Sequence, residues 1–243
     1  MQEIVVKYQT SELVPPPHAQ AIELRLSVTQ SQSLELKIGM YFLDREDFTQ
    51  EELEEEGYTG QDDLEENISL PTAWKAVLEQ LLKKTKSVEK QFLAESEAYW
   101  EIQVDNQPAF YPVNEEEWQA FLNELVQAVF EASNREKPME ITLQRIDGGL
   151  KKTHQIKASF VERSLVRVHN QTSGKPVREE LTWEELNKLL KQIYSGEMLY
   201  EEATNTEPNK TGMYVSMGDG WWFEVGKSYL ISPRKVLRTF GAE

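Results

Sequence analysis

Residues 21–43 read AIELRLSVTQSQSLELKIGMYFL, with apolar and polar side chains alternating on both sides of the polar sequence QSQS at 30–33. A period of two is typical of a strand that buries one face. The polar sequence between the two runs is a turn signal. The stretch therefore predicts an antiparallel β-hairpin, whose apolar side must be covered by other elements.

Similar short runs recur along the whole chain. Strands are expected at 3–8, 99–104, 109–113, 139–146, 153–162, 164–170, 198–202, 212–216 and 221–225. The sequence Asp147-Gly148-Gly149 separates two of them and is a hairpin turn signal. Consecutive strands joined by such short turns can pair only in antiparallel fashion, so a doubly wound parallel sheet is not expected.

Three helix starts are predicted from a Thr or Asn followed three residues later by Glu, the spacing of a capping box. These pairs are Thr49–Glu52, Asn114–Glu117 and Thr182–Glu185. Gly57 is expected to end the first, short helix, and an exposed acidic loop is expected between it and residue 70. Pro71 suits the first turn of a further helix.

Three of the expected helices share a pattern led by tryptophan. Trp74, Trp118 and Trp183 are each followed by an apolar residue three positions later and by a leucine seven positions later. Those later residues are Val77, Phe121 and Leu186, then Leu81, Leu125 and Leu190. Positions 0, 3 and 7 lie on one helix face. The pattern indicates either a strand–strand–helix unit used three times or chance similarity between amphipathic helices, and in both cases it makes the three tryptophans core residues.

The fold class predicted is α+β, with mainly antiparallel sheet and amphipathic helices packed on one face. An N-terminal strand–hairpin–helix unit with an acidic insertion is expected at 1–90, and a C-terminal α+β region at 97–243. The boundary is placed at 83–97, where charge rises and periodicity fades. One continuous domain is the alternative.

Composition excludes several classes of function. The chain of 243 residues has no cysteine, which rules out disulfides, thiol catalysis and thiolate metal sites. Its net charge of −16 disfavours nucleic acid, whose binding depends on basic contacts to phosphate. No apolar run is long enough for a membrane span, and no signal peptide is expected. These features favour a cytoplasmic protein.

No motif for a catalytic centre or a cofactor is recognisable. The phosphate loop, the dinucleotide-binding turn, the serine elbow and the His-Glu-x-x-His pair are all missing. His18, His154 and His169 are far apart in sequence, so no metal ligand or catalytic base is predicted, although folding could bring two of them together. The acidic stretches lack the loop spacing of a calcium site. Neither a catalytic residue nor a cofactor is therefore assigned.

A doubled tryptophan near the C-terminus marks the first candidate surface. After the turn sequence Gly218-Asp219-Gly220, residues 221–225 alternate, so Trp221 and Phe223 are expected on the core face. Trp222 and Glu224 point the other way. Trp222 is then either covered by the terminal helix or half exposed, and with Glu224 and Tyr214 it forms a candidate recognition surface.

The second candidate surface is acidic. Residues 44–66 hold twelve carboxylates and one arginine, and the residues assigned to the surface are Asp44, Glu46, Asp47, Asp62 and Asp63. Dense carboxylates steer basic proteins at high rates. The preferred hypothesis is a non-catalytic interaction module of inhibitor or immunity type with a basic protein partner. The alternatives are a small-molecule or carbohydrate-binding domain, and a hydrolase with a site assembled from distant residues. The oligomeric state is not readable from the sequence.

Overall fold

A computed structural model describes residues 2–28, 33–59, 62–89, 92–170 and 175–242. The chain forms two compact units, Met1–Ser133 and Asn134–Glu243. The division lies at residue 133 rather than at the expected 83–97, because the strand that follows 83–97 pairs with the first strand of the chain. Residues 90 and 91 of the expected boundary lie outside the described residues.

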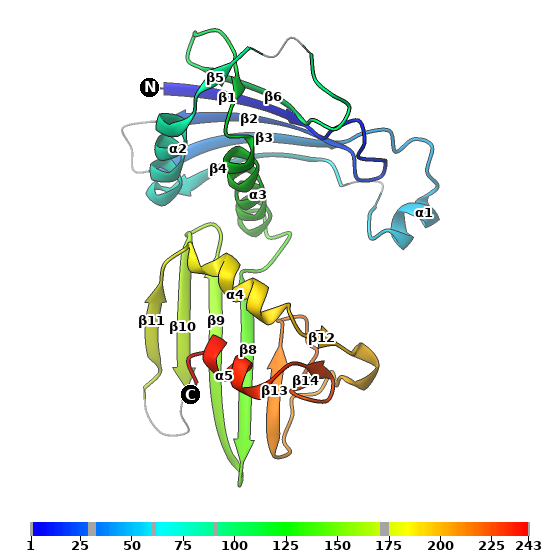
Figure 1. Cartoon of the computed structure of the whole chain (residues 1–243), viewed down its shortest axis with the longest axis vertical. Helices are drawn as coiled ribbons and strands as arrows, with labels where there is room; N and C mark the ends of the chain where they lie inside the picture. Colours follow the sequence, from blue (N-terminus) through cyan, green and yellow to red (C-terminus); the bar gives the residue numbers. More distant parts are fainter. Residues whose placement is uncertain (1, 29–32, 60–61, 90–91, 171–174, 243) are drawn as a thin grey trace. The chain divides into compact units, whose positions relative to one another are not determined.

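The first unit contains a five-stranded antiparallel sheet in the order β4-β3-β2-β1-β6 (Figure 1). Its strands are β1 (Gln2–Gln9), β2 (Gln20–Val28), β3 (Ser33–Phe42), β4 (Leu64–Pro71) and β6 (Tyr99–Val104). The expected hairpin is confirmed as β2 and β3, with Gln20 opposite Phe42. Most of its predicted turn, residues 30–32, lies outside the described residues.

β4 corrects the expectation of an exposed acidic loop between Gly57 and Pro71. Leu64 and Leu70 are buried at its two ends, and polar side chains stand between them. The strand is an edge strand of the sheet. An antiparallel sheet can leave one face in solvent, so the polar residues Asp63, Glu65, Glu66 and Asn67 are compatible with strand pairing. These four residues hid the alternation of apolar and polar side chains in the sequence.

Helices α2 (Thr72–Lys84) and α3 (Glu115–Ala132) cover one face of this sheet (Figure 1). Trp74 and Trp118 are both 0% exposed, as expected for core residues. Both indoles pack edge-on against Phe121, with ring centroids 5.9 and 6.0 Å away. The Trp118 Nε1 donates to the Thr85 hydroxyl over 3.0 Å, so the one polar atom of that buried indole is satisfied. The short strands β5 (Ser87–Val88) and β7 (Tyr111–Pro112) pair beside them.

The second unit contains a six-stranded antiparallel sheet in the order β11-β10-β9-β8-β13-β14 (Figure 1). Its strands are β8 (Met139–Asp147), β9 (Leu150–Ser159), β10 (Ser164–Asn170), β11 (Val177–Leu181), β13 (Gly212–Ser216) and β14 (Phe223–Glu224). Helices α4 (Glu185–Ile193) and α5 (Pro233–Thr239) contribute to its core. A short pair, β12 (Glu197–Met198) with β15 (Tyr229–Leu230), and the 3₁₀ turn η1 (Tyr200–Glu202) complete the unit.

The third tryptophan-led helix differs from the other two. The Thr182 amide and hydroxyl both bond the Glu185 carboxylate, at 2.9 and 3.2 Å, but α4 begins only at Glu185. Trp183 therefore precedes the helix. It is half-buried and packs edge-on against Phe160, with ring centroids 5.1 Å apart.

The two units follow the same order of elements. Each begins with four antiparallel strands, with the short helix α1 inserted between the third and fourth strands of the first unit only, and continues with a core helix. A later strand then pairs with the outer side of the first strand. A second helix ends each unit. This order differs from three strand–strand–helix units, since four strands precede the first core helix in both halves. The predicted α+β class and its antiparallel sheets are confirmed.

The end of α5 is held by two arginines of the second sheet. Arg167 donates to the Thr239 carbonyl over 3.3 Å, and Arg145 donates to the Ala242 carbonyl over 3.2 Å. Carbonyls at the end of a helix lack partners within it, and cationic donors there are favourable. Among the described residues, no helix has the length and apolar content needed to cross a bilayer.

Truncating a tryptophan of the first core should destabilise the protein strongly. We expect Trp74→Ala to lower the free energy of unfolding by about 3–5 kcal/mol, because it removes a fully buried indole and leaves a cavity. The matched control is Phe92→Ala in the same unit, where the ring is 87% exposed and the change should stay within about 0.5 kcal/mol. Urea unfolding followed by circular dichroism measures both, and equal losses would contradict the assignment.

Candidate functional site

Arg45, the one basic residue among the carboxylates of 44–66, organises the acidic segment. Its Nη1 lies 2.6 Å from the Asp62 Oδ2, and the two side chains are only 12% and 23% exposed. Its Nε donates to the Pro17 carbonyl over 2.9 Å. The guanidinium carbon lies 3.6 Å from the centre of the Phe42 ring and 4.2 Å from that of Tyr58. The planar guanidinium therefore contacts four partners at once: the two aromatic rings, the Asp62 carboxylate and the Pro17 carbonyl.

Asp62 is held by more than the ion pair. Its carboxylate also accepts from the Thr59 amide over 2.7 Å and from the Thr59 hydroxyl over 2.6 Å. Burial alone would raise the pKa of Asp62, but these hydrogen bonds and the Arg45 guanidinium together lower that pKa below its ordinary value. Asp62 therefore stays ionised at neutral pH and serves as an anchor of the segment.

Helix α1 (Gln50–Glu55) carries the most acidic part of the segment. The predicted capping box is confirmed: the Glu52 amide donates to the Thr49 hydroxyl, and the Thr49 amide donates to the Glu52 carboxylate. Gly57 follows with a φ of 82°, and the Tyr58 amide donates to the Leu53 carbonyl over 2.8 Å. A glycine in this left-handed conformation is a common helix end. Leu53 is buried, so α1 has a defined orientation on the first unit.

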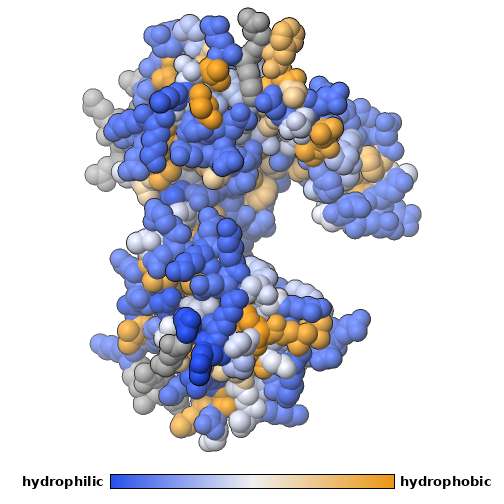
Figure 2. Space-filling view, viewed as in Figure 1, coloured by the Kyte–Doolittle hydropathy of each residue, from blue (hydrophilic) through white to orange (hydrophobic). Residues whose placement is uncertain are grey.

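The structure gives the five predicted acidic residues different roles. Asp44, Glu46 and Asp47 are exposed, and so are Glu51, Glu54 and Glu55 of α1. Asp62 turns inward to Arg45, and Asp63 accepts from the Phe42 amide over 2.9 Å. Glu52, Glu56, Asp63 and Glu65 are exposed as well, but we name the first six residues, Asp44, Glu46, Asp47, Glu51, Glu54 and Glu55, the acidic face. Figure 2 shows a mainly hydrophilic surface over the α1 region in this view. Residues 60 and 61, which the sequence analysis counted in the acidic stretch, lie outside the described residues.

The tryptophan surface belongs to the second unit. Tyr214 and Glu224 are cross-strand neighbours, so their side chains lie on the same face of the sheet, as the predicted surface requires. Tyr214 is buried, however, and Trp222 is half-buried. The Trp222 backbone exchanges two hydrogen bonds with Thr204, at 2.8 and 3.1 Å. Phe223 is buried in the core with Trp221 packed beside it, in agreement with the predicted parity. Little of this surface is open for contact.

Two histidines that the sequence could not connect lie side by side. His154 and His169 are opposite each other on β9 and β10, with 2.7 Å between their Nδ1 atoms. Burial, together with the positive charges of His169, Arg145 and Lys152, lowers the pKa of His154 to about 4. In the described part of the chain, no group of three or more His, Cys, Asp or Glu side chains is placed to hold a metal ion. The cationic surroundings also disfavour a metal at this pair.

Arg45 is the residue of the candidate site that sequence reasoning missed. The available signal was its isolation, because it is the one cation among twelve carboxylates. Its aromatic partners are close in sequence, but its contact with residue 17 depends on the fold. Pro17 and Arg45 are 28 residues apart, and no local pattern in the sequence indicates their contact.

Removing Arg45 should loosen the acidic segment. We expect Arg45→Ala to lower the free energy of unfolding by about 2–4 kcal/mol, because it leaves a largely buried carboxylate without its cation. Arg45→Lys should recover only part of this loss, since an ammonium lacks the planar fork. Amide hydrogen exchange should rise at residues 44–59. Arg25→Ala is the control, because Arg25 forms an exposed pair with Glu23 and should cost about 1 kcal/mol or less.

The histidine pair should make the second unit less stable in acid. The folded state holds His154 neutral down to about pH 4, whereas the unfolded chain binds that proton near pH 6.5. Stability is therefore complete above pH 6.5 and falls as the pH drops toward 4. His154→Phe should flatten this dependence in thermal melts at several pH values, whereas exposed His18→Gln should not. An unchanged profile in His154→Phe would contradict the assignment.

Comparison with known proteins adds no relative to this description. No protein-family model, curated protein or solved structure matches the chain. The function must therefore be inferred from the geometry of the two units.

Proposed function

We propose that the chain is a non-catalytic protein-interaction module, of inhibitor or immunity type, that acts in the cytoplasm. It binds a basic partner protein through the acidic face. The observation that carries this proposal is the Arg45 anchor, which holds the segment in one conformation while the six carboxylates of the acidic face remain exposed. A charged surface that is already ordered loses little conformational entropy when it binds.

The distribution of charge supports this proposal. Arg45, the one basic residue of the segment, is paired with Asp62, so the charged side chains that the segment exposes are all acidic. Like charges on a fixed surface add their potentials, and this raises the association rate of an oppositely charged protein by factors of about 10–1,000 at low salt. The same exposure means that each carboxylate contributes little to folding. Their high density is therefore better explained by recognition than by stability.

Neutralising the acidic face should slow association with a basic partner. The test variant replaces Glu46, Glu51, Glu54 and Glu55 by glutamine, and it leaves Glu52 in place because that residue caps α1. The control variant makes four glutamine changes at exposed glutamates of the second unit, Glu162, Glu184, Glu201 and Glu202. Both variants have the same net charge. Partners captured by the wild type would be purified, and their association rates measured at about 50 and 200 mM salt.

We expect the test variant to lower the association rate constant about tenfold or more at the lower salt concentration, and the control by less than about twofold. The difference should shrink at the higher salt concentration, because screening shortens the range of the field. Equal effects of the two variants would show that only total charge matters. That result, or capture of acidic and neutral proteins alone, would contradict the proposal.

A further inference from the structure

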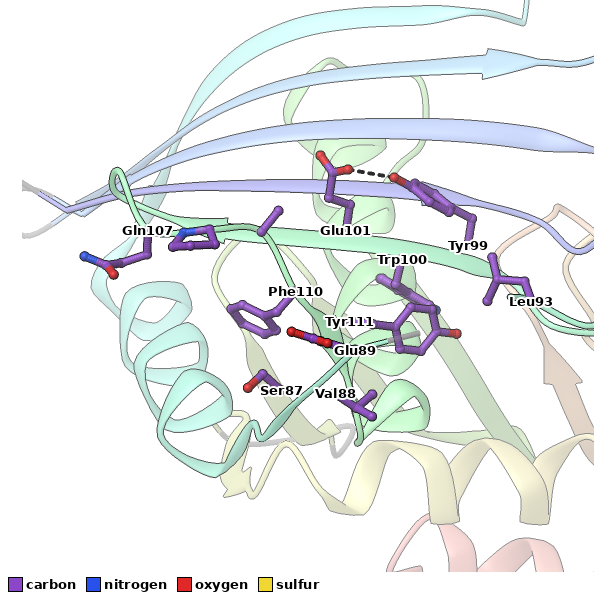
Figure 3. Close-up of a pocket in the computed structure, with 12 residues that line it drawn as sticks. Ser87, Val88, Glu89, Leu93, Tyr99, Trp100, Glu101, Gln107, Phe110 and Tyr111 are labelled. Carbon is purple, nitrogen blue, oxygen red and sulfur yellow. Dashed lines mark hydrogen bonds between the residues drawn. The ribbon is translucent and has the colours of Figure 1, made fainter. Parts of the chain in front are cut away.

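An open groove of about 670 Å³ lies along the edge of the first sheet (Figure 3). One wall is formed by β6 at Tyr99–Glu101 and the other by Ser87, Val88 and Glu89, and the strand segment Ala109–Tyr111 lies between them. Val88, Leu93 and Tyr99 line it and are exposed, as is neighbouring Phe92. The groove therefore combines apolar side chains with the edge of a sheet, a combination that suits extended peptides.

The second unit contains a segment whose strand pairing corresponds to that of Phe110 and Tyr111. In the first unit the sheet strand β6 pairs with Phe110 through Ile102, and β5 pairs with Tyr111. In the second unit β13 pairs with Phe223 through Val215, and β12 pairs with Tyr229. Each of these tyrosines is followed four residues later by the first residue of a helix, α3 or α5. The connection from Phe223 to Tyr229 is longer, but Phe110 and Phe223 occupy equivalent positions in the two units.

The two equivalent phenylalanines are covered differently. Phe223 is 0% exposed, and Tyr200 packs edge-on against it with ring centroids 4.9 Å apart. The chain after Tyr200 then reaches Thr204, which pairs with Trp222 next to Phe223. Phe110 is only half-buried, and it has no aromatic partner among the described residues. Its neighbour Ala109, which corresponds to Trp222, is exposed.

Backbone pairing with β6 fixes the orientation of the segment around Phe110. Phe110 exchanges both of its hydrogen bonds with Ile102, each 2.9 Å long. Backbone groups of adjacent strand residues point to opposite sides, so the Ala109 amide and carbonyl point away from β6. In the second unit the equivalent groups of Trp222 bind Thr204.

We propose that this groove binds an extended segment of a partner protein, with an aromatic side chain seated on Phe110 and a basic side chain beside Glu89. The second unit supplies the covering tyrosine from its own chain, and the first unit takes the corresponding aromatic side chain from the partner. A basic side chain of the partner is favoured because the negatively charged Glu89 carboxylate is exposed at the groove. Glu101 is already bound by Lys7 and by Tyr99, each over 2.7 Å, so it does not compete for this role. The inference does not depend on the acidic face, which is formed by other residues.

The test uses a five-residue peptide, KVYVK, acetylated and amidated at its ends, with valines that favour an extended chain. Its binding to the whole protein would be followed by amide chemical shifts, with KVAVK and EVYVE as comparison peptides. We expect KVYVK to bind at least about tenfold more tightly than either comparison peptide, because one lacks the ring and the other repels Glu89. The largest shifts should occur at residues 87–89 and 109–111.

Two charge-reversal variants separate this groove from the acidic face. Glu89→Lys should weaken KVYVK about tenfold and make EVYVE the better ligand, whereas Glu55→Lys on α1 should leave both affinities within about twofold. Both positions are exposed, so neither variant should unfold the protein. Shifts confined to 44–56, with sensitivity to Glu55→Lys alone, would overturn the groove and leave the acidic face intact. Equal binding of KVYVK and KVAVK, or no saturable binding of any peptide, would also overturn it.

Discussion

Burial of only one face of an antiparallel sheet is the constraint on which both units depend. It requires alternation along each strand and places the core helices, α2 and α3 in the first unit and α4 and α5 in the second, on the apolar side. Trp74, Trp118 and Phe121 meet the requirement in the first unit, where two helices share one aromatic contact. The second unit uses aliphatic side chains under α4 and places Phe223 and Phe240 in its core. The open face of each sheet is then left to polar and charged residues.

Local signals predicted much of this fold because they act over a few residues. The hairpin at 21–43, the capping box at Thr49 and the end of α1 at Gly57 each depend on neighbours in the sequence. Long-range pairing had no such signal. β6 joins β1 across about ninety residues, and this pairing moved the unit boundary to residue 133. β4 was missed since an edge strand tolerates the charges that otherwise mark a loop.

The candidate site was predictable only as a region. Charge density identified 44–66, but it could not separate displayed carboxylates from structural ones. Asp62 pairs with Arg45 and the exposed Asp63 accepts from the Phe42 amide, whereas no hydrogen bond or ion pair is described for Asp44, Glu46 and Asp47, which are also exposed. The side-chain parity of Trp221 and Trp222 was correct, yet the cover provided by Thr204 comes from a segment without clear periodicity. Function in such a chain depends on contacts that no short pattern encodes.

The shared order of elements makes the differences between the units informative. Where both halves must build a core, they use buried tyrosines at equivalent points: Tyr111 donates to the Ala98 carbonyl, and Tyr229 to the Ile193 carbonyl. The two units differ in how far the equivalent side chains are exposed to solvent. The connection before β13 covers Phe223 through Tyr200, whereas Phe110 is half-buried. The acidic insertion between β3 and β4 likewise has no counterpart between β10 and β11. Both departures fall in the first unit and leave charged or apolar side chains exposed there, which is why both proposals are placed on this unit.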